Sequence, residues 1–205
     1  MPNWQSMAEI ELLHFFEYVV AVLDKLRIPY MVVGGFASIV YGQPRFTADV
    51  DIVVDMQYRH VDPFAAAFPV PEYYVSREAI LEALDEGGSF NVIHPGTGAK
   101  VDMVPLPQDA GTRTAFMRRQ WIVYDDVSGR AAYFATAEDL VIFKLQAYRA
   151  TGSEKHLRDA RGILVTRWGQ LDMAVIGRRV AGLGMDETWE RLLEAVQRDV
   201  EEMGA

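Results

Sequence analysis

Residues 30–56 read YMVVGGFASIVYGQPRFTADVDIVVDM, and this stretch decides the fold. The apolar run Ile28–Val33 ends at two consecutive glycines, Gly34 and Gly35, and a second apolar run covers residues 50–54. The pattern predicts a strand, a short helix closed by turn-forming residues, and a second strand. Because the second run is almost continuously apolar, it is typical of a strand in a sheet covered on both faces.

Two carboxylates, Asp49 and Asp51, open the second strand. Side chains at positions i and i+2 of a strand share a face and lie about 6–7 Å apart, so these anions repel unless a cation lies beside them. Oxygen-only ligands favour Mg²⁺ or Mn²⁺. Asp102 is the only acid in the strand-like run 100–104. If the two strands are neighbours, three carboxylates converge, a set that can hold two metals about 4 Å apart.

The glycines and the residues before the acids are candidates for phosphate contacts. Gly34 and Gly35 open a helix, whose first N–H groups are free to bind phosphate oxygens. Arg45 and Thr47 could contact the phosphates or the acceptor. A glycine pair or an Asp-x-Asp motif alone is most often structural, whereas their combination with Asp102 favours a nucleotide site. The loop has neither the Walker lysine nor a G-x-G-x-x-G pattern.

The remaining chain predicts an α/β domain over residues 1–135 and a helical domain over residues 136–205. Hydrophobic periodicity places a helix over residues 7–26 and four more helices after Thr136. Alternation and turn residues predict further short strands, over residues 73–75, 90–93, 100–104, 120–124 and 131–134.

Composition excludes several classes of protein. The 205 residues include no cysteine, which rules out disulfides and thiolate zinc sites, and the four histidines show no metal-ligand spacing. The net charge of −9 argues against extended DNA binding. No apolar run approaches the roughly 20 residues of a membrane span, and no signal peptide is evident, so a cytoplasmic protein is the simplest expectation.

The motifs resemble those of the polymerase β-like nucleotidyltransferase superfamily. Its signature, an apolar strand, Gly-Gly or Gly-Ser, and then Asp-h-Asp-h with h apolar, stands here as Val33-Gly34-Gly35 and Asp49-Val50-Asp51-Ile52. The longer match is similar to the minimal branch that includes AbiEii-like toxins of toxin–antitoxin systems. Residues 137–145 and 158–160 are similar to the family's later helical region.

The resemblance implies a twisted mixed sheet flanked by helices and followed by a helical domain. It implies metal-dependent transfer of a nucleoside monophosphate from an NTP to a hydroxyl of an RNA or tRNA end or of a protein, with an antitoxin as a possible partner. Asp49, Asp51 and Asp102 would bind the metals and carry catalysis. Gly34 and Gly35 would hold the phosphates, Lys144 would reach the triphosphate, and Asp159 would support the site.

Alternatives remain for the two later residues and for the function. A lysine such as Lys144, on an apolar helix surface, often extends its ammonium to water, and an i, i+4 pair with Lys155 would explain Asp159. The protein could also be a catalytically reduced module that acts through a partner, with the striped helix over residues 186–203 as its surface. A third alternative is a small-molecule (antibiotic) nucleotidyltransferase.

Overall fold

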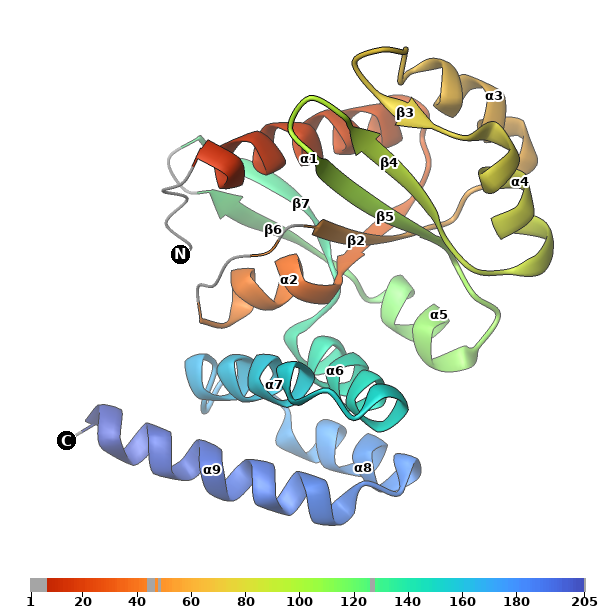
Figure 1. Cartoon of the computed structure of the whole chain (residues 1–205). Coiled ribbons are helices and arrows are strands. Elements are labelled where there is room, and N and C mark those ends of the chain that lie inside the picture. The colour runs from red at the N-terminus through yellow and green to blue at the C-terminus, as the bar shows by residue number, and fades with distance from the viewer. Residues whose placement is uncertain (1–6, 44–46, 48, 126–127, 205) are drawn as a thin grey trace. The chain divides into compact units, whose positions relative to one another are not determined.

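A computed structural model of the chain describes residues 7–43, 47, 49–125 and 128–204 (Figure 1). It contains two compact units. The sheet unit comprises Met1–Phe36 and Phe46–Ala135, and the helical unit comprises Ala37–Arg45 and Thr136–Ala205. The division falls inside helix α2 (Gly34–Tyr41), so part of the segment between the glycines and the acids belongs to the helical unit.

Within the described residues, the sheet unit holds a seven-stranded sheet in the order β3-β4-β5-β2-β1-β7-β6. β2 runs antiparallel to β1 and parallel to β5, which makes the sheet mixed, as the resemblance to nucleotidyltransferases implies. The sequence-based strand boundaries agree with the structure to within two residues. The strands are β1 (Tyr30–Val33), β2 (Asp49–Val54), β3 (Tyr74–Val75), β4 (Phe90–His94), β5 (Ala99–Pro105), β6 (Gln120–Asp125) and β7 (Arg130–Phe134).

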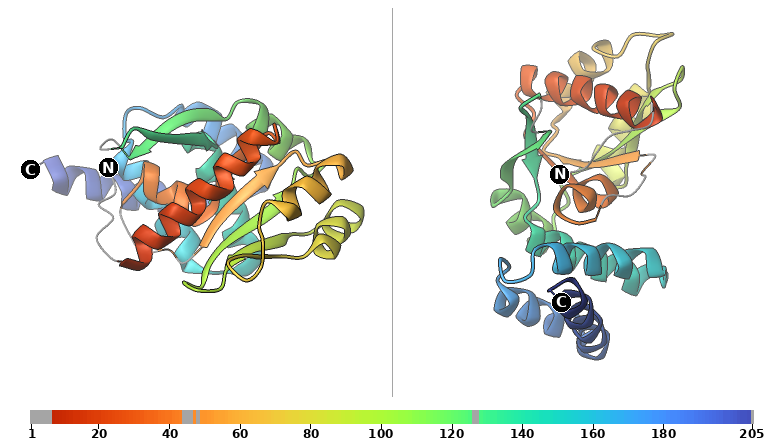
Figure 2. Two further views of the ribbon diagram at one scale, coloured as in Figure 1. Left: turned by 90° about the horizontal axis from the view of Figure 1, so that it is seen from above. Right: turned by 90° about the vertical axis from the view of Figure 1, so that its left-hand side faces the viewer.

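Helix α1 (Met7–Lys25) lies across one face of the sheet (Figure 2). α1 and α4 (Arg77–Glu86) both pack against β5, and α3 (Tyr58–Ala66) packs against α4. β2 is apolar and buried on both faces only in its second half. From Asp49 to Ile52 the strand alternates: Val50 and Ile52 are fully buried while Asp49 and Asp51 are partly exposed. The expectation of a strand covered on both faces is therefore wrong where the acids lie.

Helix α5 (Ala110–Met117) was missed by the sequence patterns. It is short, and only Ala115 and Phe116 are buried. The Asp109 side chain accepts a hydrogen bond from the Thr112 backbone N–H at 2.8 Å and so caps the helix. An aspartate, which is a preferred N-cap residue, was the local signal available in the sequence.

Four helices after Thr136 form the rest of the helical unit: α6 (Ala137–Thr151), α7 (Glu154–Thr166), α8 (Met173–Leu183) and α9 (Asp186–Gly204). The Thr136 hydroxyl accepts from the Asp139 N–H and caps α6, which ends at Gly152 with a φ of 69°. The apolar stripe of α9 packs on α7 and α8 within the same unit, with Leu192 and Val196 buried. Among the described residues, no helix has the length and apolar character to cross a membrane.

Candidate active site

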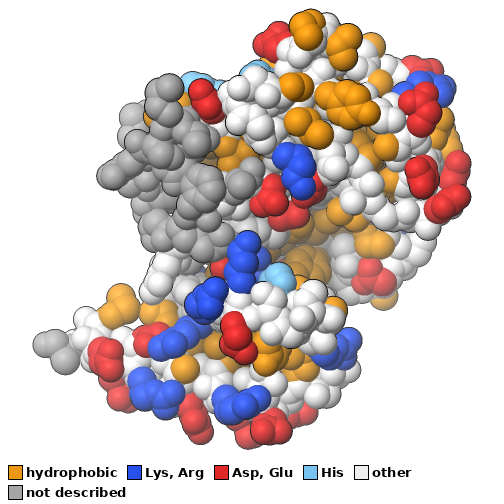
Figure 3. All heavy atoms as spheres, viewed as in Figure 1, with side chains coloured by type: hydrophobic (Ala, Val, Ile, Leu, Met, Phe, Trp, Pro, Cys, Tyr) orange, Lys and Arg blue, Asp and Glu red, His pale blue; other side chains and the backbone are white. Residues whose placement is uncertain are grey.

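Strands β2 and β5 bring four charged residues onto one face of the sheet. In their parallel register Asp51 lies opposite Asp102, and Asp49 lies opposite Lys100. Register partners share a face, and so do residues two apart on one strand. The structure therefore supplies the neighbouring strands that the three-carboxylate hypothesis requires. Acidic and basic side chains adjoin each other on the exposed part of the sheet unit in the space-filling view (Figure 3).

Gly34 and Gly35 lie directly beside the Asp51 carboxylate. Gly34 has a φ of +69°, and a Cβ added to it would lie 1.8 Å from Asp51 Oδ2. The Gly35 N–H donates to the same oxygen at 3.4 Å. A glycine is therefore required at position 34 by its backbone conformation and by the close approach of a carboxylate. The carboxylate also lies at the N-terminus of α2, where the helix dipole favours an anion.

Thr47 orients Asp49. The threonine is buried, and its hydroxyl donates to the Asp49 backbone carbonyl at 3.1 Å or to Asp49 Oδ1 at 3.3 Å. This hydrogen bond fixes the carboxylate at the start of β2, before the strand becomes fully buried. The predicted contact of Thr47 with phosphate or acceptor is untested. Arg45, its predicted companion, lies outside the described residues.

Lys100 is a site residue that sequence reasoning missed. Its Nζ donates to Asp102 Oδ2 at 2.7 Å. This hydrogen bond raises the pKa of the Lys100 ammonium, and the charges of Asp102, Asp49 and Asp51 act in the same direction, against the opposing effect of burial. The signal in the sequence was its position two residues before Asp102, which places both side chains on one strand face. Lys100 thus partly compensates three carboxylates.

The carboxylates at this site are chemically suited to bind a hard divalent cation. Within the described part of the chain, no three His, Asp or Glu side chains are already grouped closely enough to hold a metal. However, Asp102 Oδ1 is buried and has no hydrogen-bond partner among those residues, so one carboxylate oxygen is unused. The donor set consists of carboxylate oxygens, the ligands that Mg²⁺ and Mn²⁺ prefer. Binding would require Lys100 to leave Asp102 and the carboxylates to turn toward the ion.

Lys144 and Asp159 lie in the helical unit and bind each other. The Lys144 Nζ donates to Asp159 Oδ2 at 2.7 Å, and the two side chains are only 7% and 4% exposed. The alternative that Lys144 extends its ammonium to water is therefore wrong. Asp159, which the sequence could pair with Lys155, binds Lys144 on α6. Their predicted roles at the triphosphate stay predictions.

No protein-family model matches the sequence, and no curated protein matches it either. Solved structures share its fold. An antigenic nucleotidyltransferase-like protein from Paracoccidioides brasiliensis has a TM-score of 0.55 at 20% identity, over 91% of this chain and 92% of that one. The antibiotic-resistance factor ANT(2'')-Ia has a TM-score of 0.53 at 14% identity, over 97% and 100%. JHP933 from Helicobacter pylori also has a TM-score of 0.53 at 14% identity, over 98% and 97%. The chain has a nucleotidyltransferase fold.

Proposed function

We propose that this protein is a metal-dependent nucleotidyltransferase, which moves a nucleoside monophosphate from an NTP to an acceptor hydroxyl. The observation that carries the proposal is the placement of Asp49, Asp51 and Asp102 on one face of two neighbouring strands. The glycine start of α2 lies beside the Asp51 carboxylate. The fold shared with a nucleotidyltransferase-like protein supports this reaction class.

Asp49, Asp51 and Asp102 would hold Mg²⁺ or Mn²⁺. The metal would neutralise charge on the triphosphate and make the acceptor hydroxyl more acidic. Thr47 holds the Asp49 carboxylate in place for this role. The Gly35 N–H, which makes a long contact with Asp51, would turn to a phosphate oxygen when a nucleotide binds.

In the transfer step, the acceptor oxygen forms a bond to the α-phosphorus while the bond to the pyrophosphate oxygen breaks. The acceptor loses one proton, and Asp102 is the residue to accept it, because its Oδ1 has no hydrogen-bond partner among the described residues. Pyrophosphate leaves with the electron pair of the broken bond. The nucleotide is thereby attached to the acceptor as a phosphodiester.

Lys144 and Asp159 enter the proposal as a phosphate contact and its supporting acid. This role requires the ammonium to release Asp159, to which it is bound in the structure. Arg45 is a further proposed phosphate or acceptor contact.

The acceptor that we propose is a hydroxyl of an RNA or tRNA end or of a protein. This is the acceptor class that the resemblance to AbiEii-like toxins implies, and an antitoxin would be the corresponding partner. ANT(2'')-Ia is an antibiotic-resistance factor, so a small-molecule antibiotic is the second acceptor class to test.

The test is transfer of label from each α-³²P-labelled NTP, with Mg²⁺, to total RNA, to protein, or to small hydroxylated antibiotics. We expect label in one acceptor class. Asp51→Asn and Asp102→Asn should each lower the rate at least about 100-fold, because each removes a ligand charge. Asp55→Asn is the matched control, since Asp55 directly follows β2 and lies outside the acidic group.

Two results would overturn the proposal. One is the absence of label in every acceptor class. The other is an Asp51→Asn variant as active as Asp55→Asn. Binding of metal and nucleotide without any transfer would instead support the catalytically reduced module.

A further inference from the structure

A cavity in the sheet unit lies at the opposite end of β1 from the acids. It has a volume of about 210 Å³, and Tyr30, the first residue of β1, lines it together with Arg27 and Arg119. The other end of β1 is the end beside the acids, because Val33 lies opposite Asp51. The two locations are therefore separated by the length of the strand. From the residues of this cavity we infer that it binds phosphate, either free or as a monoester.

Arg119 is held rigidly at the cavity. Its guanidinium carbon lies 4.3 Å from the centre of the Phe116 ring and 5.1 Å from that of Tyr133. One terminal nitrogen, Nη1, donates to the Phe116 carbonyl at 2.6 Å. Its Nε is buried and has no hydrogen-bond partner among the described residues. A guanidinium fixed in this way loses little conformational entropy when it binds an oxyanion.

Tyr30 adds a second donor without an acceptor. The residue is 1% exposed, and its hydroxyl has no hydrogen-bond partner of good geometry among the described residues, although the Tyr133 backbone lies near it. Burial raises the pKa of Tyr30, so the phenol stays protonated and can donate. Arg27, whose φ is 55°, contributes a second positive charge to the cavity. Donors therefore exceed acceptors, and this excess suits an anion.

Asp24 indicates which kind of anion the cavity can bind. Its carboxylate also lines the cavity, and within the described residues it forms no ion pair with Arg27 or Arg119. A carboxylate repels a fully deprotonated anion, but it accepts a hydrogen bond from an anion that carries a proton. Inorganic phosphate keeps at least one proton at neutral pH, whereas sulfate carries none. A phosphate monoester, whose second pKa is about 6, keeps its last proton only in part. The residue set therefore fits phosphate better than sulfate.

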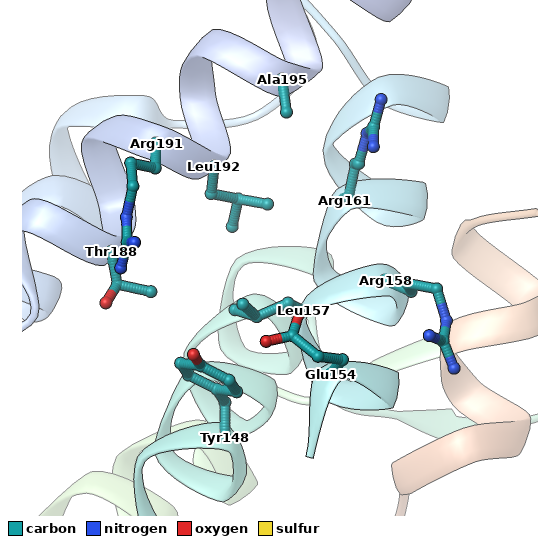
Figure 4. Close-up of a pocket in the computed structure, with 9 residues that line it drawn as sticks. All are labelled: Tyr148, Glu154, Leu157, Arg158, Arg161, Thr188, Arg191, Leu192 and Ala195. Carbon is teal, nitrogen blue, oxygen red and sulfur yellow. The ribbon is translucent and has the colours of Figure 1, made fainter. Parts of the chain in front are cut away.

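A larger cavity, of about 280 Å³, lies in the helical unit between α6, α7 and α9, but its arginines are less suited to an anion. Arg161 donates to the Asp199 carboxylate at 2.6 Å. Arg158 points away from the centre of the cavity (Figure 4). Its arginines are therefore paired or turned outward, whereas Arg119 keeps a buried Nε without a hydrogen-bond partner among the described residues.

The experiment measures the midpoint of thermal unfolding of the whole protein, without divalent metal and at constant ionic strength. Inorganic phosphate, adenosine monophosphate, sulfate and acetate are titrated separately. We expect saturable stabilisation by phosphate, by the monoester, or by both, and at least tenfold weaker binding of sulfate and acetate. The relative affinities of the two phosphate forms identify the source of the ligand.

Three variants test the assignment. Tyr30→Phe removes only the hydroxyl and should weaken the binding of phosphate about tenfold. Arg119→Lys keeps the charge but loses the planar guanidinium, and it should weaken phosphate binding at least as much. Asp24→Asn should reduce the preference for phosphate over sulfate. Arg113→Gln is the matched control, because Arg113 is an exposed arginine of α5 outside the cavity.

Equal affinity for phosphate and sulfate in the wild type would overturn the inference. So would phosphate binding that Tyr30→Phe and Arg119→Lys leave unchanged, since the anion would then bind elsewhere. If Arg119→Lys fails to fold, Tyr30→Phe and Asp24→Asn still test whether phosphate binds in this cavity. None of these readouts depends on nucleotidyl transfer, so the inference and the proposed function fail separately.

Discussion

Two lysine–aspartate pairs in this protein have the same length and different surroundings. Lys100–Asp102 in the sheet unit and Lys144–Asp159 in the helical unit both have a nitrogen–oxygen distance of 2.7 Å. The first pair is 37% and 21% exposed and lies beside two further carboxylates. The second is 7% and 4% exposed and connects two helices. Only the first pair can separate without leaving a charge in an apolar interior.

The difference shows that contact distance alone does not identify a functional lysine. An exposed ion pair contributes about 0–1 kcal/mol, because water replaces each partner at little cost. Removing one partner from a buried pair costs about 3–5 kcal/mol, because the other charge remains without solvent. Lys100 can therefore give way to a substrate or a metal at small cost, whereas the phosphate contact proposed for Lys144 requires the more costly separation of the buried pair between α6 and α7.

The largest expected effect comes from breaking the buried pair. Lys144→Met should lower the free energy of unfolding of the helical unit by about 3–5 kcal/mol, because the buried Asp159 carboxylate loses the ammonium that it binds at 2.7 Å. Urea unfolding followed by tryptophan fluorescence measures it, since Trp168 and Trp189 both lie in this unit. Adding Asp159→Leu to Lys144→Met should restore much of the loss.

The same variant separates the two roles of Lys144. If Lys144→Met unfolds at the wild-type urea concentration but binds NTP more weakly, the ammonium acts on phosphate and the buried pair is unimportant for stability. Loss of stability with NTP affinity retained in the folded fraction would assign Lys144 to structure alone.

The second effect tests how closely the glycine turn approaches the acids. Gly34→Ala should cost about 2–4 kcal/mol of unfolding free energy, because the residue has a positive φ and its Cβ would overlap Asp51 Oδ2. Gly129→Ala is the matched control. Gly129 has the same φ of +69°, and a Cβ there meets nothing within 4 Å. The control should cost only about 1–2 kcal/mol. Equal costs for both variants would show that Asp51 moves aside freely.

Local sequence patterns carry most of the fold. The two apolar runs around Gly34-Gly35 predict two strands. Asp49 and Asp51 are two residues apart, so the alternation of side chains along a strand predicts that they share a face. The link from Asp51 to Asp102 needed the order of strands, which local pattern does not contain. The sequence therefore predicted this link only if the two strands were neighbours, and the β2–β5 register shows that they are.

What the sequence could not provide was burial around charged groups. Lys144 looked like a phosphate contact by resemblance, and its partner Asp159 is fifteen residues away on another helix. The sequence did not identify Lys100 as a site residue, because its role depends on Asp49 and Asp51 of a different strand. Helix α5 was missed because it buries little apolar surface. The two lysine features depend on contacts between separate elements, whereas the cap of α5 is a local contact.

The third effect concerns Lys100 as a competitor of the metal. Lys100→Met should raise the affinity for Mn²⁺, without nucleotide, about fivefold, which corresponds to about 1 kcal/mol for an exposed pair. Titration calorimetry or the paramagnetic signal of free Mn²⁺ measures the dissociation constant. Lys25→Met removes the same charge at the end of α1 and should leave the affinity nearly unchanged. An affinity that falls in Lys100→Met would mean that Lys100 supports the metal site instead of opposing it.

The smallest effect is a difference in acid sensitivity between the two units. In the sheet unit, burial and then the charge of Arg59 lower the pKa of His60 below its usual 6.5. His60 Nδ1 accepts a hydrogen bond from the Gln57 N–H at 3.1 Å, which a protonated ring cannot do. Its stabilising effect is therefore complete above about pH 6.5 and is lost as the pH falls toward the lowered pKa.

In the helical unit, a hydrogen bond from Arg161 lowers the pKa of Asp199 below its usual 3.8. That contribution is present above this value and disappears only as the pH falls through the lowered pKa. Urea midpoints measured from pH 7 to pH 3 should show the sheet unit weakening first. His60→Gln, which keeps an acceptor for the Gln57 N–H, should flatten the curve between pH 7 and pH 5. Asp199→Asn should leave that range unchanged, because Asp199 stays ionised throughout it, and should alter only the most acidic points.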